Sequence, residues 1–380
     1  MEFSRAGGSG FPAFEPKEKI KEAERMHNLF KRVILALLVI CVVAGVASAG
    51  PKYKWSFAQP WTRPVADKGY QLFCEKVKEY TNGDIEITFH SNGLLGTHDE
   101  SLHGVRDGSI EIATLSPYVN LVPGGMMNWM PWTVSTFDEA RIAYAYPDGI
   151  LFKVMQVAWN EVGVQMLFSC GQGAYGLGNN QRPLKHPDDL KNLKMRVSSS
   201  LASVRCLGNM GSGTGMTMET IPWAEVYNAL ARGVVDGCWS MWPSLVEERH
   251  AEVLKHYTHG LLNWDANNVV INKELWDSLD PKYQEAIYKA GAEAEQYLND
   301  LYEAEEQNYI NKLKADYPNL TITTLTEEER AVWREKANMA AIWEELCDPW
   351  LDKHWPGQKM GEKIRAELDA VRVQAAAKKK

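Results

Sequence analysis

One long helical stretch, from Pro281 to Asp316, constrains the fold more than any other feature of the chain. Asp280 is a typical N-cap before a first-turn proline, and the helix must end before Pro318 because the residue preceding a proline disfavours helical backbone. At a rise of about 1.5 Å per residue, such a helix is on the order of 50 Å long, which exceeds the diameter of a small domain. We therefore expect it to lie across two domains as a shared spine. A coiled coil is the alternative, but the stretch lacks a clean heptad seam.

The residues before this helix alternate between strand and helix patterns. Runs rich in β-branched and aromatic residues predict three strands, at 52–58, 84–90 and 110–115. Helical stripes lie between them, and Thr97 with Glu100 forms a capping box for the second helix. This order predicts a mostly parallel sheet covered by helices. A second set of strands follows, including one at 234–237, and the strand at 267–272 is expected to return to the first domain.

The N-terminal region has the pattern of an export signal. Lys31 and Arg32 precede an apolar run at 33–44 that is too short for a comfortable membrane span, and Ala-Ser-Ala at 47–49 fits a cleavage site. We therefore expect a mature chain in the periplasm from about Gly50, with no direct membrane insertion. An uncleaved membrane anchor is the alternative.

Charge and missing motifs exclude several functional classes. The net charge is −8 and no basic stripe occurs, which argues against nucleic acid, because such binding rests on phosphate neutralisation. The glycine-rich run at 208–216 lacks a phosphate-loop lysine, and the chain has no GxSxG or HExxH motif and no CxxC pair. We therefore expect no cofactor, and we interpret His250, His256 and His259 as solvated helix histidines. The six cysteines are expected to be mostly small buried side chains without a disulfide framework.

Arg196 is the anion-binding candidate that the residues themselves suggest. Lys194, Arg196 and Ser198 alternate with Met195 and Val197, which predicts a short strand with one apolar face. A guanidinium presents its donors in a fixed fork that matches a carboxylate, and in a cleft it would attract an anion. On the residues alone, a solvated surface charge remains the alternative.

Four stretches resemble the solute-binding proteins of the tripartite ATP-independent periplasmic (TRAP) transporters, of the DctP type. They are TNGDIEITFHSNGLLGTHDESLHGVRDGSIEIA at 81–113, RPLKHPDDLKNLKMRV at 182–197, IPWAEVYNALARGVVDG at 221–237 and the long helix at 281–316. The resemblance covers residues 52–355. It implies an α/β, two-lobed periplasmic binding protein fold with a ligand cleft between the lobes. It also implies a non-enzymatic protein that captures an organic acid by lobe closure and delivers it to the small and large permease subunits.

The resemblance also divides the chain into parts. They are an upstream extension at 1–25, a signal peptide at 26–49, lobe I at 50–172 with 261–300, lobe II at 173–260 with 301–355, and a C-terminal helix and frayed tail at 356–380.

Family positions imply roles for individual residues. Arg196 falls on the arginine that clamps the ligand carboxylate, and Ser199, three residues on, falls on a common polar contact. Trp223 falls where the family often has an aromatic lining the cleft. Gln59, at the end of the first strand, and His98, at the start of the next helix, are expected at the cleft mouth of the first lobe.

Two departures from the family pattern bear on the ligand. Trp239 and Ser240 stand where metal-dependent members carry an acid and an amide, so no metal is expected. Tyr175 stands where dicarboxylate and sialic-acid binders often carry a second arginine, which favours a monocarboxylate. The side chains expected to form an aromatic cleft are Tyr175, Trp223, Trp239 and Trp242, with Trp61 and Tyr118. This pattern predicts a hydrophobic or aromatic acid; a small dicarboxylate or a sugar acid is the alternative ligand.

Two other functions stay open at this point. The same module could act as a ligand sensor for a membrane receptor, or the chain could be an exported enzyme. The absence of a recognisable nucleophile and base motif counts against the enzyme.

Overall fold

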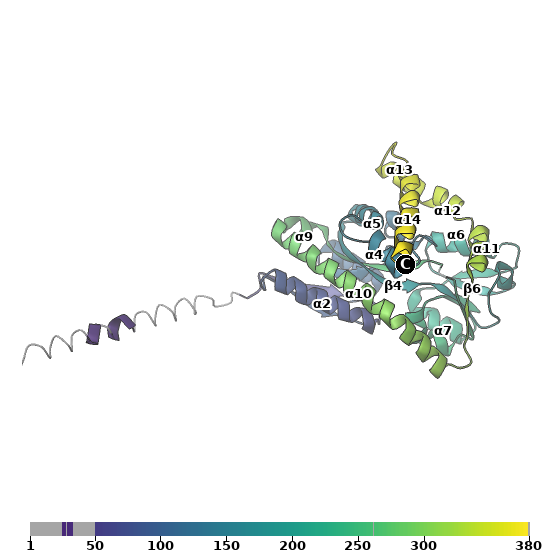
Figure 1. Cartoon of the computed structure of the whole chain (residues 1–380), viewed down its shortest axis with the longest axis horizontal. Helices are drawn as coiled ribbons and strands as arrows, with labels where there is room; N and C mark the ends of the chain where they lie inside the picture. The colour runs from purple at the N-terminus through teal and green to yellow at the C-terminus, as the bar shows by residue number, and fades with distance from the viewer. Residues whose placement is uncertain (1–24, 28, 33–49, 261, 379–380) are drawn as a thin grey trace, which may run out of the picture. The chain divides into compact units, whose positions relative to one another are not determined.

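The computed structural model describes residues 25–27, 29–32, 50–260 and 262–378 (Figure 1). It separates Met1–Lys52 from one compact unit, Tyr53–Lys380. In the first part, residues 25–27 and 29–32 are helical, while the apolar run and the cleavage site of the predicted signal peptide lie outside the described residues. Within the described ranges, no helix combines the length and apolarity that a membrane span requires.

The first sheet of the compact unit has the strand order β2–β1–β3–β10–β4. Its strands are β1 (Tyr53–Ala58), β2 (Ile85–His90), β3 (Ile112–Leu115), β4 (Val164–Ala174) and β10 (Trp264–Asn272). Strand β1 pairs in parallel with both β2 and β3, and β10 joins this sheet as predicted. However, β10 runs antiparallel to β3 and β4. The parallel arrangement predicted for the first three strands is therefore confirmed, whereas β10 runs against its neighbours because it arrives from the second sheet and not through a crossover helix.

The second sheet has the order β11–β9–β5–β8–β6–β7. Its strands are β5 (Gly176–Asn179), β6 (Lys194–Val197), β7 (Thr217–Thr220), β8 (Gly237–Ser240), β9 (His256–His259) and β11 (Thr321–Thr324). Strand β8 begins where the strand expected at 234–237 should end. The histidine interpretation is also wrong, because His256 and His259 lie on a strand and His259 is buried.

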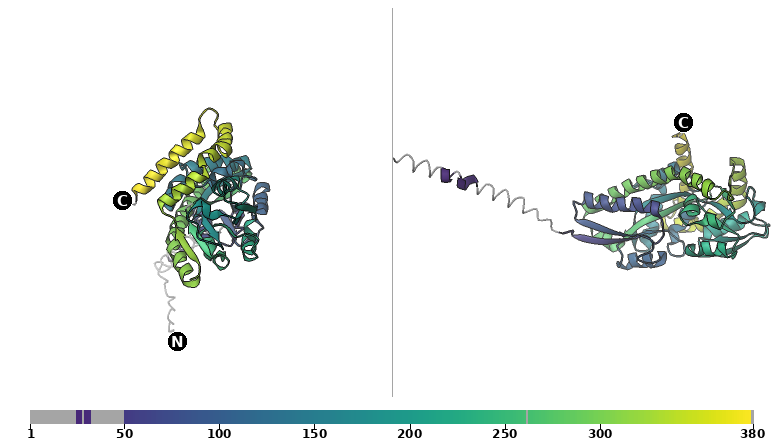
Figure 2. Two further views of the ribbon diagram at one scale, coloured as in Figure 1. Left: turned by 90° about the vertical axis from the view of Figure 1, so that its right-hand side faces the viewer. Right: turned by 90° about the horizontal axis from the view of Figure 1, so that it is seen from below.

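Helices surround both sheets (Figures 1 and 2). They are α2 (Pro64–Tyr80), α3 (His98–Asp107), α4 (Phe137–Ala143), α5 (Ile150–Glu161), α6 (Leu201–Met210), α7 (Val226–Ala231), α8 (Trp242–Val246), α9 (Lys273–Ser278), α10 (Pro281–Asp316), α11 (Glu327–Ala337), α12 (Met339–Leu346), α13 (Asp348–His354) and α14 (Met360–Ala377). Short 3₁₀ turns are η1 (Pro123–Trp129), η2 (Pro187–Leu190), η3 (Trp223–Glu225) and η4 (His250–Glu252). The capping box of Thr97 and Glu100 is present at α3. Helix α14 runs to Ala377 with Ala375 buried, so the expected frayed tail begins later than predicted.

Helix α10 is the predicted spine. It begins at Pro281 after the Asp280 cap and ends at Asp316, as the sequence pattern predicts. It contacts α2 and β4 beside the first sheet and α8 beside the second, and Figures 1 and 2 both show it alongside α2. A helix of 36 residues is roughly 54 Å long, which lets one element contact the first sheet and also a helix beside the second.

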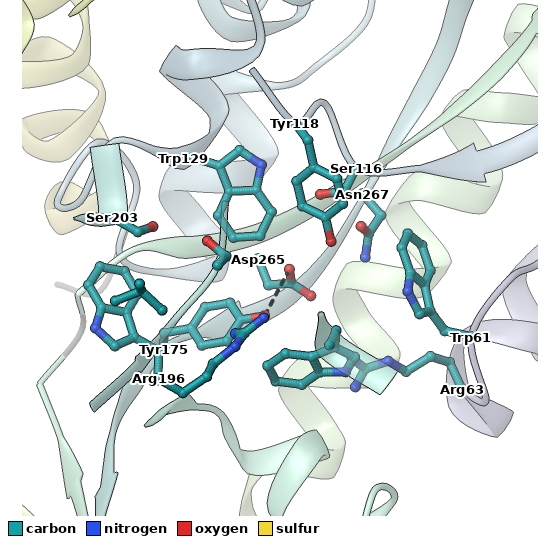
Figure 3. A pocket seen from close by; sticks show the side chains of 14 residues that line it. Trp61, Arg63, Ser116, Tyr118, Trp129, Tyr175, Arg196, Ser203, Asp265 and Asn267 are labelled. Carbon is teal, nitrogen blue, oxygen red and sulfur yellow. Dashed lines mark hydrogen bonds between the residues drawn. The ribbon is translucent and has the colours of Figure 1, made fainter. Parts of the chain in front are cut away.

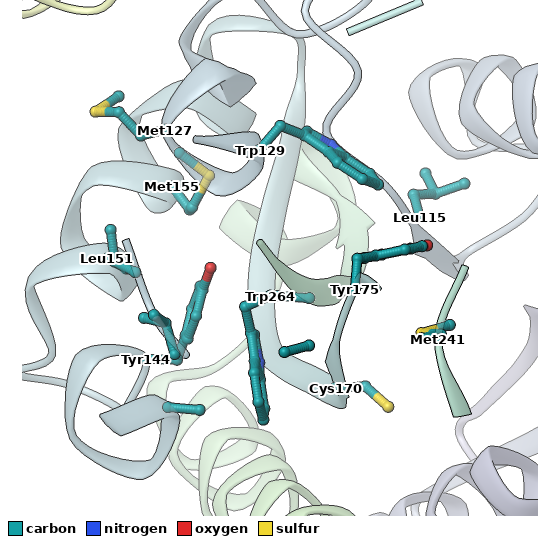
Figure 4. Packing of buried hydrophobic residues seen from close by; sticks show 14 of the residues in the cluster. Leu115, Met127, Trp129, Tyr144, Leu151, Met155, Cys170, Tyr175, Met241 and Trp264 are labelled. Atoms are coloured by element: carbon teal, nitrogen blue, oxygen red, sulfur yellow. The ribbon is translucent and has the colours of Figure 1, made fainter. Parts of the chain in front are cut away.

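The chain passes from one sheet to the other at Tyr175 and again before β10. These two passages are hydrogen-bonded together: the Tyr175 N–H donates to the Asn263 carbonyl (2.8 Å), and the Leu262 N–H donates to the Tyr175 carbonyl (2.9 Å). Successive side chains of a strand point to opposite faces, so Trp264 and Asp265 face opposite ways. Trp264 packs edge-on against Phe137. Figure 4 shows Trp264 among the buried hydrophobic side chains. Asp265 therefore faces the other side of the junction.

Candidate functional site

A cavity of about 40 Å³, here called the inner chamber, lies at the junction of the two sheets (Figure 3). Its lining comes from both sheets and from the passage between them: Trp61, Arg63, Ser116, Tyr118, Trp129, Tyr175, Arg196, Val197, Ser198, Ser203, Trp223, Trp239, Asp265 and Asn267. A larger cavity of about 380 Å³, the outer chamber, shares Trp61, Tyr118, Arg196, Ser198 and Trp223 with it. The two chambers are therefore adjoining parts of one site.

Most residues singled out in the sequence come together here. Those that line the inner chamber are Trp61, Tyr118, Tyr175, Arg196, Trp223 and Trp239. Ser199 and His98 line the outer chamber. Both His98 ring nitrogens are engaged, with Asp99 Oδ1 (2.8 Å) and with the Ser116 carbonyl oxygen (2.9 Å), so His98 supports the wall.

Three of the expected residues lie elsewhere. Gln59 is buried behind the chamber wall, where its side-chain oxygen accepts from the Trp61 N–H (3.4 Å). Ser240 is fully buried, and its Oγ lies 3.3 Å from His250 Nδ1. Trp242 lines a different cavity and donates to Glu306 Oε1 (3.0 Å). The structure thus does not bring Gln59, Ser240 or Trp242 to either chamber, because Gln59 and Ser240 are buried in the packing and Trp242 faces another cavity.

Arg196 lies on β6 and is only 4% exposed, so the alternative of a solvated surface charge is wrong. Its Nε donates to the Ile221 carbonyl (2.8 Å), and its guanidinium carbon lies 5.3 Å from the centre of the Trp223 ring. Burial lowers its pKa. In the described part of the chain, no carboxylate oxygen lies within 4 Å of its guanidinium nitrogens. By contrast, Lys194 on the same strand is partly exposed and pairs with Glu219 (3.4 Å).

Arg63 is a second guanidinium in the chamber, which the sequence analysis missed. It directly precedes α2, is 4% exposed, and its Nη2 lies 3.1 Å from Glu248 Oε1. The same carboxylate oxygen accepts from Trp223 Nε1 (2.8 Å). Arg63 Nε and Nη1 are buried without a partner among the described residues. The expectation of a single arginine is therefore corrected, although Glu248 balances the charge of this second one.

Asp265 is the other charged residue that sequence reasoning missed. It is 3% exposed, and its Oδ1 accepts from the Tyr175 hydroxyl (3.3 Å). In the described chain its Oδ2 is buried without a hydrogen-bond partner. Burial raises the pKa of this carboxyl to about 6, although the nearby Arg63 acts in the opposite direction. The alternation of Asp265 and Asn267 on one face of β10 is the signal that could have revealed it, but the predicted strand began too late to include Asp265.

Aromatic side chains make the rest of the wall. The Tyr118 ring stacks on Trp129 (5.7 Å between centroids) and lies 4.6 Å from the His98 ring. Tyr175 lies between the other rings, with centroids 6.4 Å from Trp129, 6.4 Å from Trp223 and 6.5 Å from Trp239. The chamber therefore combines aromatic faces with a few buried charges, as small-molecule sites do.

The described residues contain no group of three or more metal-ligating side chains. The cysteines among them are buried, and burial raises the pKa of the thiol at each of the five, Cys74, Cys170, Cys206, Cys238 and Cys347.

Comparison with known proteins identifies the family. Residues 61–347 match the DctP model, described as bacterial extracellular solute-binding protein, family 7. The chain belongs to this family. The resemblance seen in the sequence is thereby confirmed, and the family consists of binding proteins.

Individual relatives agree with this assignment. The chain is 28% identical over 326 residues to the C4-dicarboxylate-binding periplasmic protein DctP of Rhodobacter capsulatus, with 81% of this chain and 92% of that protein covered. A TRAP periplasmic solute-binding protein from Ochrobactrum anthropi has a TM-score of 0.73 and 23% identity, over 85% of this chain and 97% of that one. A second, from Roseobacter denitrificans with bound β-D-glucuronate, has a TM-score of 0.71 and 23% identity, over 82% and 99%. These structures confirm the predicted α/β, two-lobed fold.

Proposed function

We propose that this family 7 protein is the periplasmic receptor of a TRAP transporter, and that it binds an organic carboxylate in the inner and outer chambers. The observation that carries the proposal is Arg196, a buried guanidinium that lines both chambers and has no carboxylate partner among the described residues. Burying an uncompensated charge is costly, whereas a ligand carboxylate would pair with it. Two compared relatives, a C4-dicarboxylate binder and a structure with bound glucuronate, also have acids in their descriptions.

The two sheets suggest how the ligand would be held. We assign lobe I to 50–172 with 261–300 and lobe II to 173–260 with 301–355, with the passages at Tyr175 and before β10 as hinges. Since the chambers are lined from both sheets, closing the lobes would desolvate the ligand and strengthen its pairing with Arg196. The closed form would be recognised by the small and large permease subunits. Export would use the signal peptide at 26–49, and no catalytic step is involved.

The test uses the purified mature chain and a panel of organic acids, screened by thermal shift and then by calorimetry. Arg196→Ala should weaken binding of the best acid by at least ~2 kcal/mol, which is the cost of losing a desolvated charge-assisted pair. Lys194→Ala is the matched control, because Lys194 lies on the same strand but pairs with Glu219 at the surface. Unchanged affinity in folded Arg196→Ala protein, or a best ligand without a carboxylate, would contradict the proposal.

A further inference from the structure

The charged side chains at the inner chamber balance each other. Arg63 and Arg196 supply two positive charges, and Glu248 and Asp265 supply two negative ones. Arg63 and Glu248 form an ion pair at 3.1 Å. The pair engages Arg63 Nη2, while Arg63 Nε and Nη1 stay without a partner among the described residues. In net charge the pair is neutral, so the charges left for a ligand are the cation Arg196 and the anion Asp265.

Arg196 and Asp265 do not satisfy each other. No ion pair within 4 Å joins them, although both are described and both line the inner chamber. Figure 3 shows the Asp265 carboxylate in the middle of the lining side chains, with its oxygen bonded to Tyr175. Its second oxygen, Oδ2, is buried without a partner in the described chain. An unpaired carboxylate oxygen in a buried site favours a ligand group that brings positive charge or hydrogen-bond donors.

The aromatic walls favour the same kind of group. Trp129, Tyr175 and Trp239 line the inner chamber together with Asp265, and Trp223 already holds the Arg196 guanidinium over its ring at 5.3 Å. The faces of such rings attract cations, most strongly where water is excluded. A wall of rings around an anionic carboxylate is therefore suited to a cationic nitrogen. A purely hydrophobic acid would offer the buried Asp265 carboxylate neither a positive charge nor a hydrogen-bond donor, so the burial of that charge would remain unfavourable.

We propose that the solute is a zwitterion: an organic acid that also carries an amino or quaternary ammonium group, with its carboxylate at Arg196 and its cationic nitrogen at Asp265 among the aromatic rings. This inference rests on the proposed carboxylate-binding function and narrows it. A zwitterion takes the place of the hydrophobic or aromatic acid expected from the sequence, because the aromatic rings would contact its cationic group. The site thus presents two opposite charges to two ends of one small molecule.

The experiment compares pairs of ligands that differ only in the charge of one group. Suitable pairs are glycine betaine with 3,3-dimethylbutyrate, proline with cyclopentanecarboxylate, and 4-aminobutyrate with pentanoate. Ligand-stripped protein is titrated with each compound by calorimetry. We expect a zwitterion to be the tightest binder of the panel and to bind at least tenfold more tightly than the partner acid that lacks the cationic nitrogen.

Variants separate this inference from the proposed function. Asp265→Asn keeps the shape of the side chain but removes its charge, and it should bring the affinity ratio within a pair close to one. Asp148→Asn is the control for net charge, since the Asp148 side chain is 89% exposed. If the acids without a cationic nitrogen bind as tightly as the zwitterions, or if no zwitterion binds, the inference is overturned while carboxylate binding through Arg196 stands. If Arg196→Ala leaves the affinity for every compound unchanged, the proposed function itself fails.

Discussion

The Arg63 guanidinium and the Glu248 carboxylate form a buried ion pair, 3.1 Å between Nη2 and Oε1, that connects the two sides of the inner chamber. Arg63 directly precedes α2, beside the first sheet, and Glu248 follows α8, beside the second. Trp223 Nε1 donates to the same oxygen of Glu248. The pair thus joins an element beside the first sheet to an element beside the second at the wall of the candidate site.

Breaking this pair should weaken ligand binding. Glu248→Gln keeps an acceptor for Trp223 but leaves Arg63 buried without a counter-charge, and that cost falls on the closed form. We expect the affinity of the best ligand to fall by about 10- to 100-fold, or ~1.4–3 kcal/mol. Calorimetry measures the affinity, and small-angle scattering measures how compact the liganded protein is. The double variant Arg63→Met/Glu248→Leu should recover part of the loss, and wild-type affinity in Glu248→Gln would contradict a latch between the lobes.

The indole nitrogen of Trp223 should contribute to the free energy of ligand binding separately from its aromatic ring. Trp223→Phe keeps an aromatic face near Arg196 but removes the donor to Glu248, so we expect a loss of ~1 kcal/mol in binding free energy. Trp223→Ala, which loses both, should cost more. Trp350→Phe is the matched control, because Trp350 Nε1 donates to Glu161 (2.8 Å) and lines neither chamber. Equal affinities for Trp223→Phe and wild type would show that the donor has no role in binding.

The helix ends that the sequence predicted correctly are marked by residues next to those ends. The Asp280 cap and the proline at 318 are adjacent to the ends of α10, and the capping box of Thr97 and Glu100 sits at the start of α3. Each of these residues acts on backbone groups a few positions away, so its effect can be predicted without knowledge of the tertiary structure. The strand direction of β10 could not be read this way, because it depends on which sheet the chain leaves before it arrives.

The charges of the site were predictable only in part. Arg196 was found because it stands in a recognisable stretch, at 182–197. Arg63 and Asp265 were missed because their roles arise from contacts with residues distant in the sequence: Glu248 for the first and Tyr175 for the second. A sequence pattern shows which residue types are present, but it does not show which buried charge is left without a partner.

Acid pH should weaken zwitterion binding through Asp265. Burial raises its pKa to about 6 in the ligand-free protein, in the presence of Arg63, Glu248, Tyr175 and Arg196. The carboxyl is therefore mostly ionised at pH 7 and mostly protonated at pH 5, where it no longer attracts a cation. Affinity should fall by about tenfold between these pH values, from the fraction of protein with ionised Asp265. Titrations at pH 5, 6 and 7 measure this, and Asp265→Asn should show a flat profile; a flat wild-type profile would contradict the prediction.

Raising the pH from about 4.5 to 8 should destabilise the fold through Glu295, which is buried on α10. Its Oε2 accepts a long hydrogen bond from the Ser169 N–H (3.5 Å), and burial raises its pKa from 4.5 to about 8. The folded protein therefore keeps this proton at neutral pH, while the unfolded chain has already lost it. Because the unfolded state binds fewer protons, the free energy of unfolding should fall as pH rises from about 4.5 through 8.

Glu295→Gln removes this titration but keeps the size and polarity of the side chain. We expect the variant to resemble wild type at pH 5 and to be more stable at pH 8.5, by an amount on the order of a few kcal/mol. Urea unfolding of the ligand-free protein at both pH values measures the difference. Glu285→Gln, on the exposed face of the same helix, should leave the pH dependence unchanged. If Glu295→Gln instead lost the same stability at both pH values, Glu295 would act through its hydrogen bond to Ser169, and its proton would not account for the fall in stability with rising pH.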